Sequence, residues 1–118
     1  MDLLTRIQIL KDAEQITEET KQGMIKVIEM FDREYSIKLT EENGAMLITH
    51  LCIAIERIKK NEMVNKIDSM IYEEIKNSDF FKISLQTLGK MERELGITIP
   101  EIEQQFILMH LCVLFDRI

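Results

Sequence analysis

The sequence predicts an all-α protein built around a single hydrophobic core. The chain of 118 residues has one proline, four glycines and no tryptophan, and 46% of its residues are apolar while 31% are charged. This balance is typical of a soluble globular domain that is rich in helix-forming residues. Apolar side chains also recur at steps of three and four residues along the chain, as on the buried face of a helix. At this length one core can form without disulfides or metals.

The first two helices are predicted from apolar spacing and from one capping residue. Leu3, Ile7 and Leu10 share a face of a short first helix. Thr17, which two glutamates follow, is the expected N-cap of a second helix, because its hydroxyl can accept a hydrogen bond from the first turn. The apolar stripe of this second helix continues to Tyr35.

A third helix is predicted from about residue 41 to residue 60. Thr40 is its expected N-cap, and the charges at its two ends agree with the helix dipole, acidic at the start and basic at the end. Its wide apolar face predicts deep packing. The residues on that face are Met46, Leu47, Leu51, Ala54, Ile55 and Ile58.

The second half of the chain predicts three more helices. An amphipathic segment covers about residues 63–77, and the break at residues 77–79 opens a helix that Gly96 closes at its C′ position. Pro100 at the first helical position starts the last helix, which is almost continuously apolar from residue 106 to residue 115 and is therefore placed in the core. The inward residues of the amphipathic segment are predicted to be Val64, Ile67, Met70, Ile71 and Ile75.

Charge and hydropathy exclude several classes of function. The net charge is −6, and the one basic cluster, residues 57–60, lies at a predicted helix end, so direct nucleic-acid binding is not expected. No apolar run approaches the roughly 20 residues that span a bilayer, and the N-terminus lacks a signal-peptide pattern. We therefore expect a cytoplasmic protein without a membrane partner.

One stretch of the sequence occurs twice, sixty residues apart. Residues 50–58, HLCIAIERI, return as residues 110–118, HLCVLFDRI. The similarity extends upstream of both stretches, where residues 37–41 match residues 97–101. The only two histidines and the only two cysteines of the chain all lie in this repeat, at equivalent positions. The pattern suggests two related sites, or one site built from two related helices.

Each histidine of the repeat is followed by an arginine seven residues later. Arg57 follows His50 and Arg117 follows His110 at a spacing of almost two helical turns, which places each arginine on the face of its histidine. Helical side chains lean toward the N-terminus, so the guanidinium can reach back toward the imidazole. Because a guanidinium suits a phosphate group, each repeat could present a nucleophilic imidazole beside a cation.

Two other interpretations of these residues stay open. The histidines could be inert, hydrogen-bonded core residues, with Glu56–Arg57 and Asp116–Arg117 as surface ion pairs. A metal site is less favoured, because a histidine and a cysteine two residues apart point to nearly opposite sides of a helix. The cysteines are expected to be reduced core residues, and no cofactor is expected.

At these residues the chain resembles the PRD family, the phosphotransferase-system regulation domain of bacterial antiterminators and activators. The first family motif reads THLCIAIER at residues 49–57, and the second reads IPEIEQQFILMHL at residues 99–111. The resemblance covers roughly residues 20–118. It implies a compact bundle of five helices in which two roughly antiparallel pairs are related by an internal pseudo-two-fold repeat.

The resemblance also implies a function and assigns roles to residues. Family members are phosphorylated reversibly on histidine by the phosphocarrier HPr or by sugar-specific enzyme IIB components, and phosphorylation shifts domain packing and dimerisation. By position, His50 and His110 become the acceptors, Arg57 takes the family arginine position, and Glu103 takes the acidic position before the second histidine. Arg117 is the counterpart of Arg57 in the repeat and is a second candidate to support phosphate.

These observations together predict a stand-alone regulatory domain that is not an enzyme. Residues 1–16 are expected to form a helical extension, and residues 17–118 the PRD-like domain. The expected partners are HPr or an enzyme IIB, together with a second copy or another PRD-containing protein. The alternative is an interaction or dimerisation module of the same fold that is not phosphorylated.

Overall fold

The computed structural model describes residues 1–62 and 64–118, and all the regular secondary structure of these residues is helical. The predicted all-α fold is therefore confirmed. The helices are α1 (Leu3–Asp12), α2 (Glu18–Tyr35), α3 (Glu41–Lys59), α4 (Ser69–Lys76), α5 (Phe81–Leu95) and α6 (Glu101–Arg117). In this part of the chain no helix is both long enough and apolar enough to cross a lipid bilayer.

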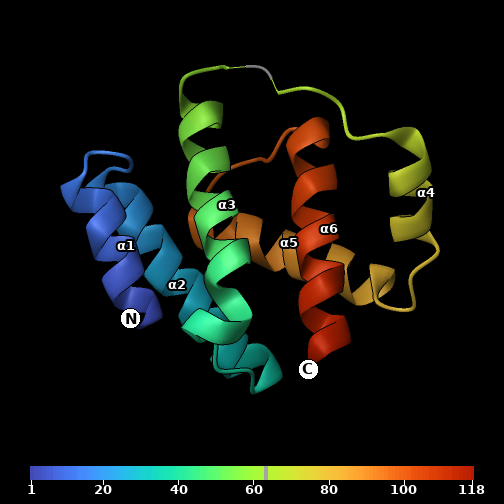
Figure 1. Cartoon of the computed structure of the whole chain (residues 1–118), viewed down its shortest axis with the longest axis horizontal. Helices are drawn as coiled ribbons and strands as arrows, with labels where there is room; N and C mark the ends of the chain where they lie inside the picture. Colours follow the sequence, from blue (N-terminus) through green and yellow to red (C-terminus); the bar gives the residue numbers. More distant parts are fainter. Residues whose placement is uncertain (63) are drawn as a thin grey trace.

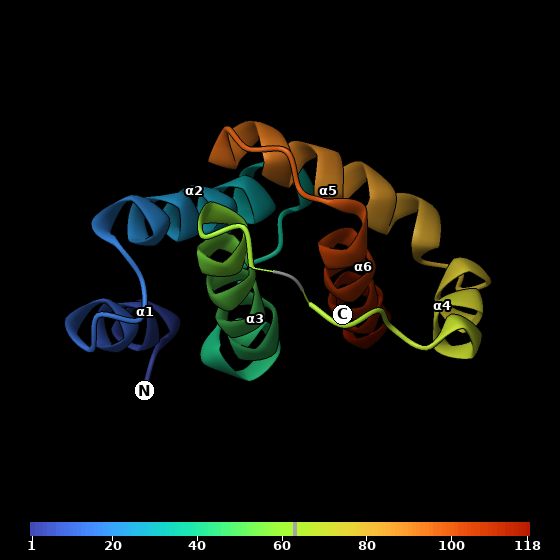
Figure 2. The same ribbon diagram turned by 90° about the horizontal axis from the view of Figure 1, so that it is seen from above.

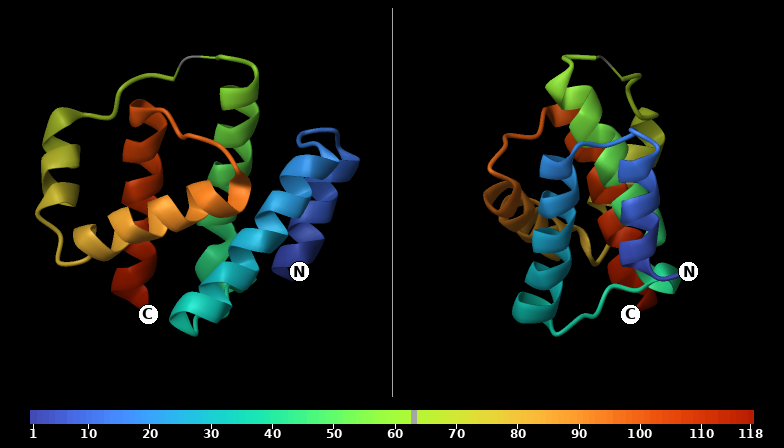
Figure 3. Two further views of the ribbon diagram at one scale, coloured as in Figure 1. Left: turned by 180° about the vertical axis from the view of Figure 1, so that it is seen from behind. Right: turned by 90° about the vertical axis from the view of Figure 1, so that its left-hand side faces the viewer.

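The helices form two layers. Helices α1, α3, α6 and α4 lie side by side in one layer, with α3 and α6 in its centre (Figures 1 and 2). Helices α2 and α5 cross behind them, as the view from behind shows (Figure 3). The chain runs up α3 and down α6, so the two central helices are antiparallel (Figure 1).

The ends of the helices follow from individual residues. Thr17 and Thr40 are N-caps, as predicted, and Thr40 forms a reciprocal capping box with Asn43. Gly96 ends α5 in the left-handed conformation, with φ of 65°, where the absence of a Cβ removes the steric penalty. Pro100 is the N-cap of α6 rather than its first helical residue.

The sixty-residue spacing of the sequence repeat recurs in the positions of structural features. Ser36 and Gly96 are both left-handed C-caps, and α3 and α6 begin at Glu41 and Glu101. The two-fold relation between the halves stays a prediction. The expected N-terminal extension does contain a helix, α1, and its Leu3 side chain belongs to the main hydrophobic core.

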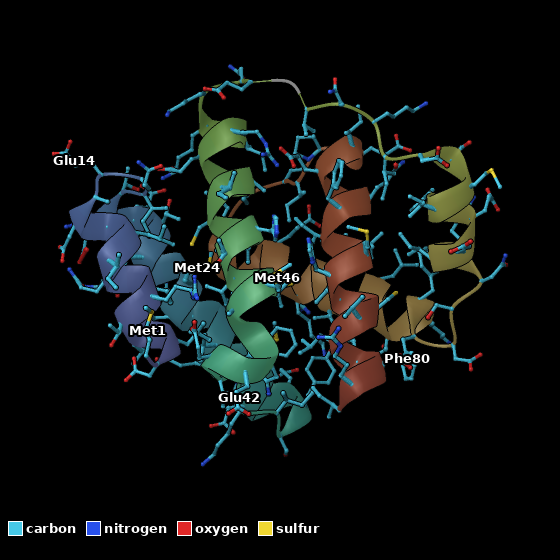
Figure 4. All side chains as sticks on the ribbon, viewed as in Figure 1. Met1, Glu14, Met24, Glu42, Met46 and Phe80 are labelled. Carbon is cyan, nitrogen blue, oxygen red and sulfur yellow. The ribbon has the colours of Figure 1, made fainter. Side chains whose placement is uncertain are left out.

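Two predictions, one about α3 and one about α4, are wrong. Met46 on α3 is 63% exposed, because the seam between α3 and its neighbours is narrower than the apolar stripe of the sequence. By contrast Met24 on α2 is fully buried (both residues are labelled in Figure 4). The second error concerns the segment predicted as a helix over residues 63–77.

That segment is helical only from Ser69. The Asp68 carboxylate accepts hydrogen bonds from the backbone N–H groups of Met70 and Ile71, which caps α4 at this point. Residues 64–68 have no regular secondary structure and cross the end of the bundle (Figure 1). Met70 and Ile71 are exposed, because this short helix buries only Ile75 against the bundle. Residue 63 lies outside the described residues.

Candidate functional site

The two histidines of the repeat meet in the seam between α3 and α6. His50 lies at the middle of α3 and His110 next to the middle of α6. Because the two helices are antiparallel neighbours, residues near their midpoints face each other (Figure 1). The imidazole rings are stacked, with 4.4 Å between their centroids and 17° between their planes. The structure therefore brings the two predicted acceptors into one site.

The two imidazoles differ in their surroundings. His50 is exposed, whereas His110 is half-buried. Burial, together with a smaller effect of the nearby charge of protonated His50, lowers the pKa of His110 from 6.5 to about 4. His110 is therefore neutral at physiological pH.

Arg57 and Glu103 form the second contact that joins α3 to α6. The Arg57 Nε and Nη2 atoms donate hydrogen bonds to the two carboxylate oxygens of Glu103, each at 2.9 Å. The Glu103 side chain is 5% exposed and that of Arg57 is 29% exposed. This bidentate contact raises the pKa of Arg57 above its usual value.

The position of this ion pair follows from the antiparallel packing. Arg57 lies seven residues after His50, and Glu103 lies seven residues before His110. On antiparallel helices that meet at the histidines, these two positions coincide at one end of the seam. The matching positions at the other end are Arg117 and Asn43.

At that other end the ion pair has no equivalent. Asn43 is neutral, and its side-chain oxygen accepts a hydrogen bond from the Thr40 N–H as part of the cap of α3. Arg117 is exposed, and within residues 1–62 and 64–118 it forms no ion pair. The site is therefore asymmetric, with a neutralised guanidinium at one end and a solvated guanidinium at the other.

The expectation that each arginine reaches back to its own histidine does not describe Arg57, whose guanidinium is directed across the seam to Glu103. The surface ion pair between Glu56 and Arg57, which belongs to the alternative interpretation with inert histidines, is not formed either, because Glu56 lies near Lys59. The physical reason is that a buried carboxylate on the facing helix competes better for the guanidinium than solvated groups do.

Exposed apolar side chains flank the stacked rings on both helices. Ile53 and Val113, which are equivalent in the repeat, each follow their histidine by three residues, and each is 44% exposed. Residues three apart on a helix share a face. Met46, also exposed, precedes His50 by one helical turn. We call these three residues the apolar rim of the histidine pair.

The cysteines lie in the core, as expected. Both are free and buried. Burial raises the pKa of Cys52 to about 12, with a further contribution from the negative charge of Glu56. Its thiol is therefore protonated and unreactive at neutral pH. Among the described residues no group of three or more potential ligands is placed to hold a metal ion.

Sequence reasoning missed the stacking of the histidines and the pairing of Arg57 with Glu103. A signal for both was present. The spacing of seven residues occurs after His50 and, in the opposite direction, before His110, which is the pattern expected of two antiparallel helices. This spacing could be interpreted only if the relative direction of the two helices, which are sixty residues apart in sequence, was known.

We predict that Arg57→Met destabilises the protein by about 3 kcal/mol, because it leaves the Glu103 carboxylate buried without a partner. Arg117→Met, the same change at the equivalent exposed position, should alter the unfolding free energy by less than about 0.5 kcal/mol. Urea denaturation measures both. Equal, small losses in the two variants would show that Arg57 and Glu103 act as an ordinary surface pair.

We also predict that His110 does not titrate between pH 7 and pH 5. Because the folded-state pKa lies below the unfolded value of 6.5, the unfolded chain binds a proton in this range that the folded chain does not. The unfolding free energy should then fall as the pH falls from about 6.5 to about 4, by at most about 1.4 kcal/mol per pH unit from this residue. NMR of the imidazole C–H protons follows the titration directly. In His50→Asn the pKa of His110 should rise, and a midpoint near 6.5 in the unaltered protein would contradict the prediction.

The chain is similar in sequence to known proteins. Residues 25–112, most of the chain, match the family described as PRD domain. The uncharacterized protein YhfY of Escherichia coli (strain K12) is 23% identical over 107 residues, which cover 91% of this chain and 89% of that protein. No solved structure matches the chain. With the family match spanning both histidine helices, the chain belongs to the PRD domain family.

Proposed function

We propose that the protein is a regulatory domain whose histidines are phosphorylated reversibly by components of the sugar phosphotransferase system, HPr or an enzyme IIB. The observation that carries this proposal is the pair of stacked imidazoles in the α3–α6 seam, one of them exposed. PRD domains are known in the regulation of that system, and this chain belongs to the family. In this proposal the protein is a substrate of phosphotransfer and not an enzyme, it acts in the cytoplasm, and it binds no cofactor.

The chemistry of the pair suits a phosphoryl acceptor. An uncharged imidazole nitrogen carries the lone pair that attacks phosphorus, and an exposed ring can be reached by the phosphohistidine or phosphocysteine of a carrier protein. The phosphoryl group adds a charge of roughly −1.5 to −2 and three strong hydrogen-bond acceptors. Arg117 is the solvated guanidinium on the α6 side, and it is a candidate to pair with that charge.

Phosphorylation in this seam would change the forces between α3 and α6. A phosphoryl group beside the pair competes for the guanidinium of Arg57, which Glu103 now holds, and it repels the buried Glu103 carboxylate. Both effects act on the packing of the two central helices. We infer that the output is a change of dimerisation, or of binding to a partner protein in transcriptional regulation, at the surface that contains the apolar rim.

A second function is supported by the apolar rim itself. Exposed Met46, Ile53 and Val113 lie on one face, which is typical of a protein-binding surface. An interaction module of the same fold could use this face without any phosphorylation. The two proposals differ in whether the imidazoles accept phosphate.

We predict that label from phosphoenolpyruvate reaches this protein through enzyme I and HPr, with or without an enzyme IIB. The label should be acid-labile, as a phosphoramidate on histidine is, and it should be absent from the His50→Ala, His110→Ala double variant. Scintillation counting of the gel-purified protein measures it, and circular dichroism confirms that each variant is folded.

Two controls sharpen this test. Ile53→Ala changes the same face without removing an imidazole, so it should still accept label if it binds the donor. Absence of label with every donor tested, in protein that is folded, would contradict the proposal and leave the interaction module as the function.

A further inference from the structure

We propose that His50 and His110 form one acceptor of single capacity, in which His50 takes the phosphoryl group and its stacked partner stays unmodified. This inference deepens the proposed function and rests on it for the identity of the biological donor. It rests on the geometry of the pair for everything else.

The first step is the distance between the rings. Their centroids are 4.4 Å apart and their planes are nearly parallel, so a group attached to one ring lies close to the other ring. Two phosphoryl groups on such a pair would place two multiply charged anions near each other, whichever ring nitrogens carry them. Repulsion between them should suppress the second addition by about tenfold or more, even with the screening of water.

The second step is the difference in access. A donor must approach the attacking nitrogen in line with the bond that breaks, and this requires an exposed ring. His50 is exposed, whereas His110 is half-buried in the same seam. Met46 and Ile53 of the apolar rim, both exposed, lie within about one helical turn of His50 on the same helix. His50 is therefore the ring that a donor meets first.

The third step is the reaction itself. For a donor that carries the phosphoryl group on nitrogen, as phosphoramidate does, the lone pair of a His50 ring nitrogen forms a new N–P bond while the bond between phosphorus and the donor nitrogen breaks. The electron pair of the broken bond returns to the donor nitrogen, which takes up a proton from solvent. The His50 ring releases its own N–H proton to solvent, so charge and protons balance without any oxidant or further reactant.

Single capacity has a consequence for signalling. Two independent sites would allow four phosphorylation states, whereas a single-capacity pair allows two. Donors that act on the same pair would then compete for one position instead of adding their effects. The pseudo-equivalent histidines of the repeat would form a two-state switch within one domain.

The test uses potassium phosphoramidate, a small chemical donor that phosphorylates accessible histidines without any carrier protein. Intact-mass spectrometry under non-acidic conditions counts the phosphoryl groups. We expect the folded protein to reach a limit of one group per chain and fragmentation to place it on His50. The same protein in urea, where the rings are separated, should accept two.

Matched variants complete the test. His110→Asn should still accept one group, on His50, whereas His50→Asn should react at least tenfold more slowly than His110→Asn. Two groups on the folded protein would overturn the inference, as would first labelling of His110 or no labelling of the folded protein.

The outcomes also separate this inference from the proposed function. One group on His50 from phosphoramidate, with no label from the carrier proteins, would support the single-capacity pair and refute the phosphotransferase role. Label from the carriers together with two groups per folded chain would do the reverse.

Discussion

The antiparallel packing of α3 against α6 is the constraint on which the rest of the structure depends. It brings two residues that are sixty positions apart in sequence, His50 and His110, into ring-to-ring contact at the centre of the seam. It also brings Arg57 and Glu103 together at one end. Helices α2 and α5 close the back of this pair, and α1 and α4 flank it on either side (Figure 2).

This packing links the stability of the domain to its proposed phosphorylation. The Glu103 carboxylate is buried and can stay ionised there because Arg57 binds both of its oxygens. The same guanidinium belongs to the arginine of the family motif on α3. A new anion in the seam would therefore act on a contact that also holds the two helices together, which is how a local charge can alter the packing of a domain.

The other end of the seam departs from the symmetry of the repeat, so the two ends of the site differ in charge and in contacts. Asn43 stands where a second acidic residue would complete the repeat, and it caps α3 instead. Arg117 is consequently solvated. One end of the seam is closed by an ion pair while the other offers a cation to the solvent. The two histidines between these ends also differ in exposure, although their sequence motifs match.

Much of the fold could be predicted from the sequence because its signals are local. Thr17, Thr40 and Gly96 mark helix ends by their own capping chemistry, and the structure confirms all three. The exposure of Met46 could not be predicted, because the width of an apolar stripe does not reveal how much of it the neighbouring helices cover. The length of α4 was overestimated because the cap at Asp68 competes with an apolar pattern that continues on both sides of it.

The residues that meet in the α3–α6 seam could be singled out from the sequence, but their arrangement could not. The histidines, arginines and Glu103 follow from the repeat and from the family motifs, whereas their pairing depends on the direction of two distant helices. Arg57 pairs with Glu103 and not with its sequence neighbour Glu56. This pairing depends on how α3 and α6 pack, which local sequence does not reveal.

The account depends most directly on the contact between the two imidazoles. The chain contains only two histidines, so selective labelling of histidine with ¹³C leaves two imidazoles to assign in an NMR spectrum. At a centroid separation of 4.4 Å, the ring protons of His50 and His110 should give a clear nuclear Overhauser cross-peak in the folded protein. Its absence, with both ring signals assigned and the protein folded, would contradict the paired site on which the account is built.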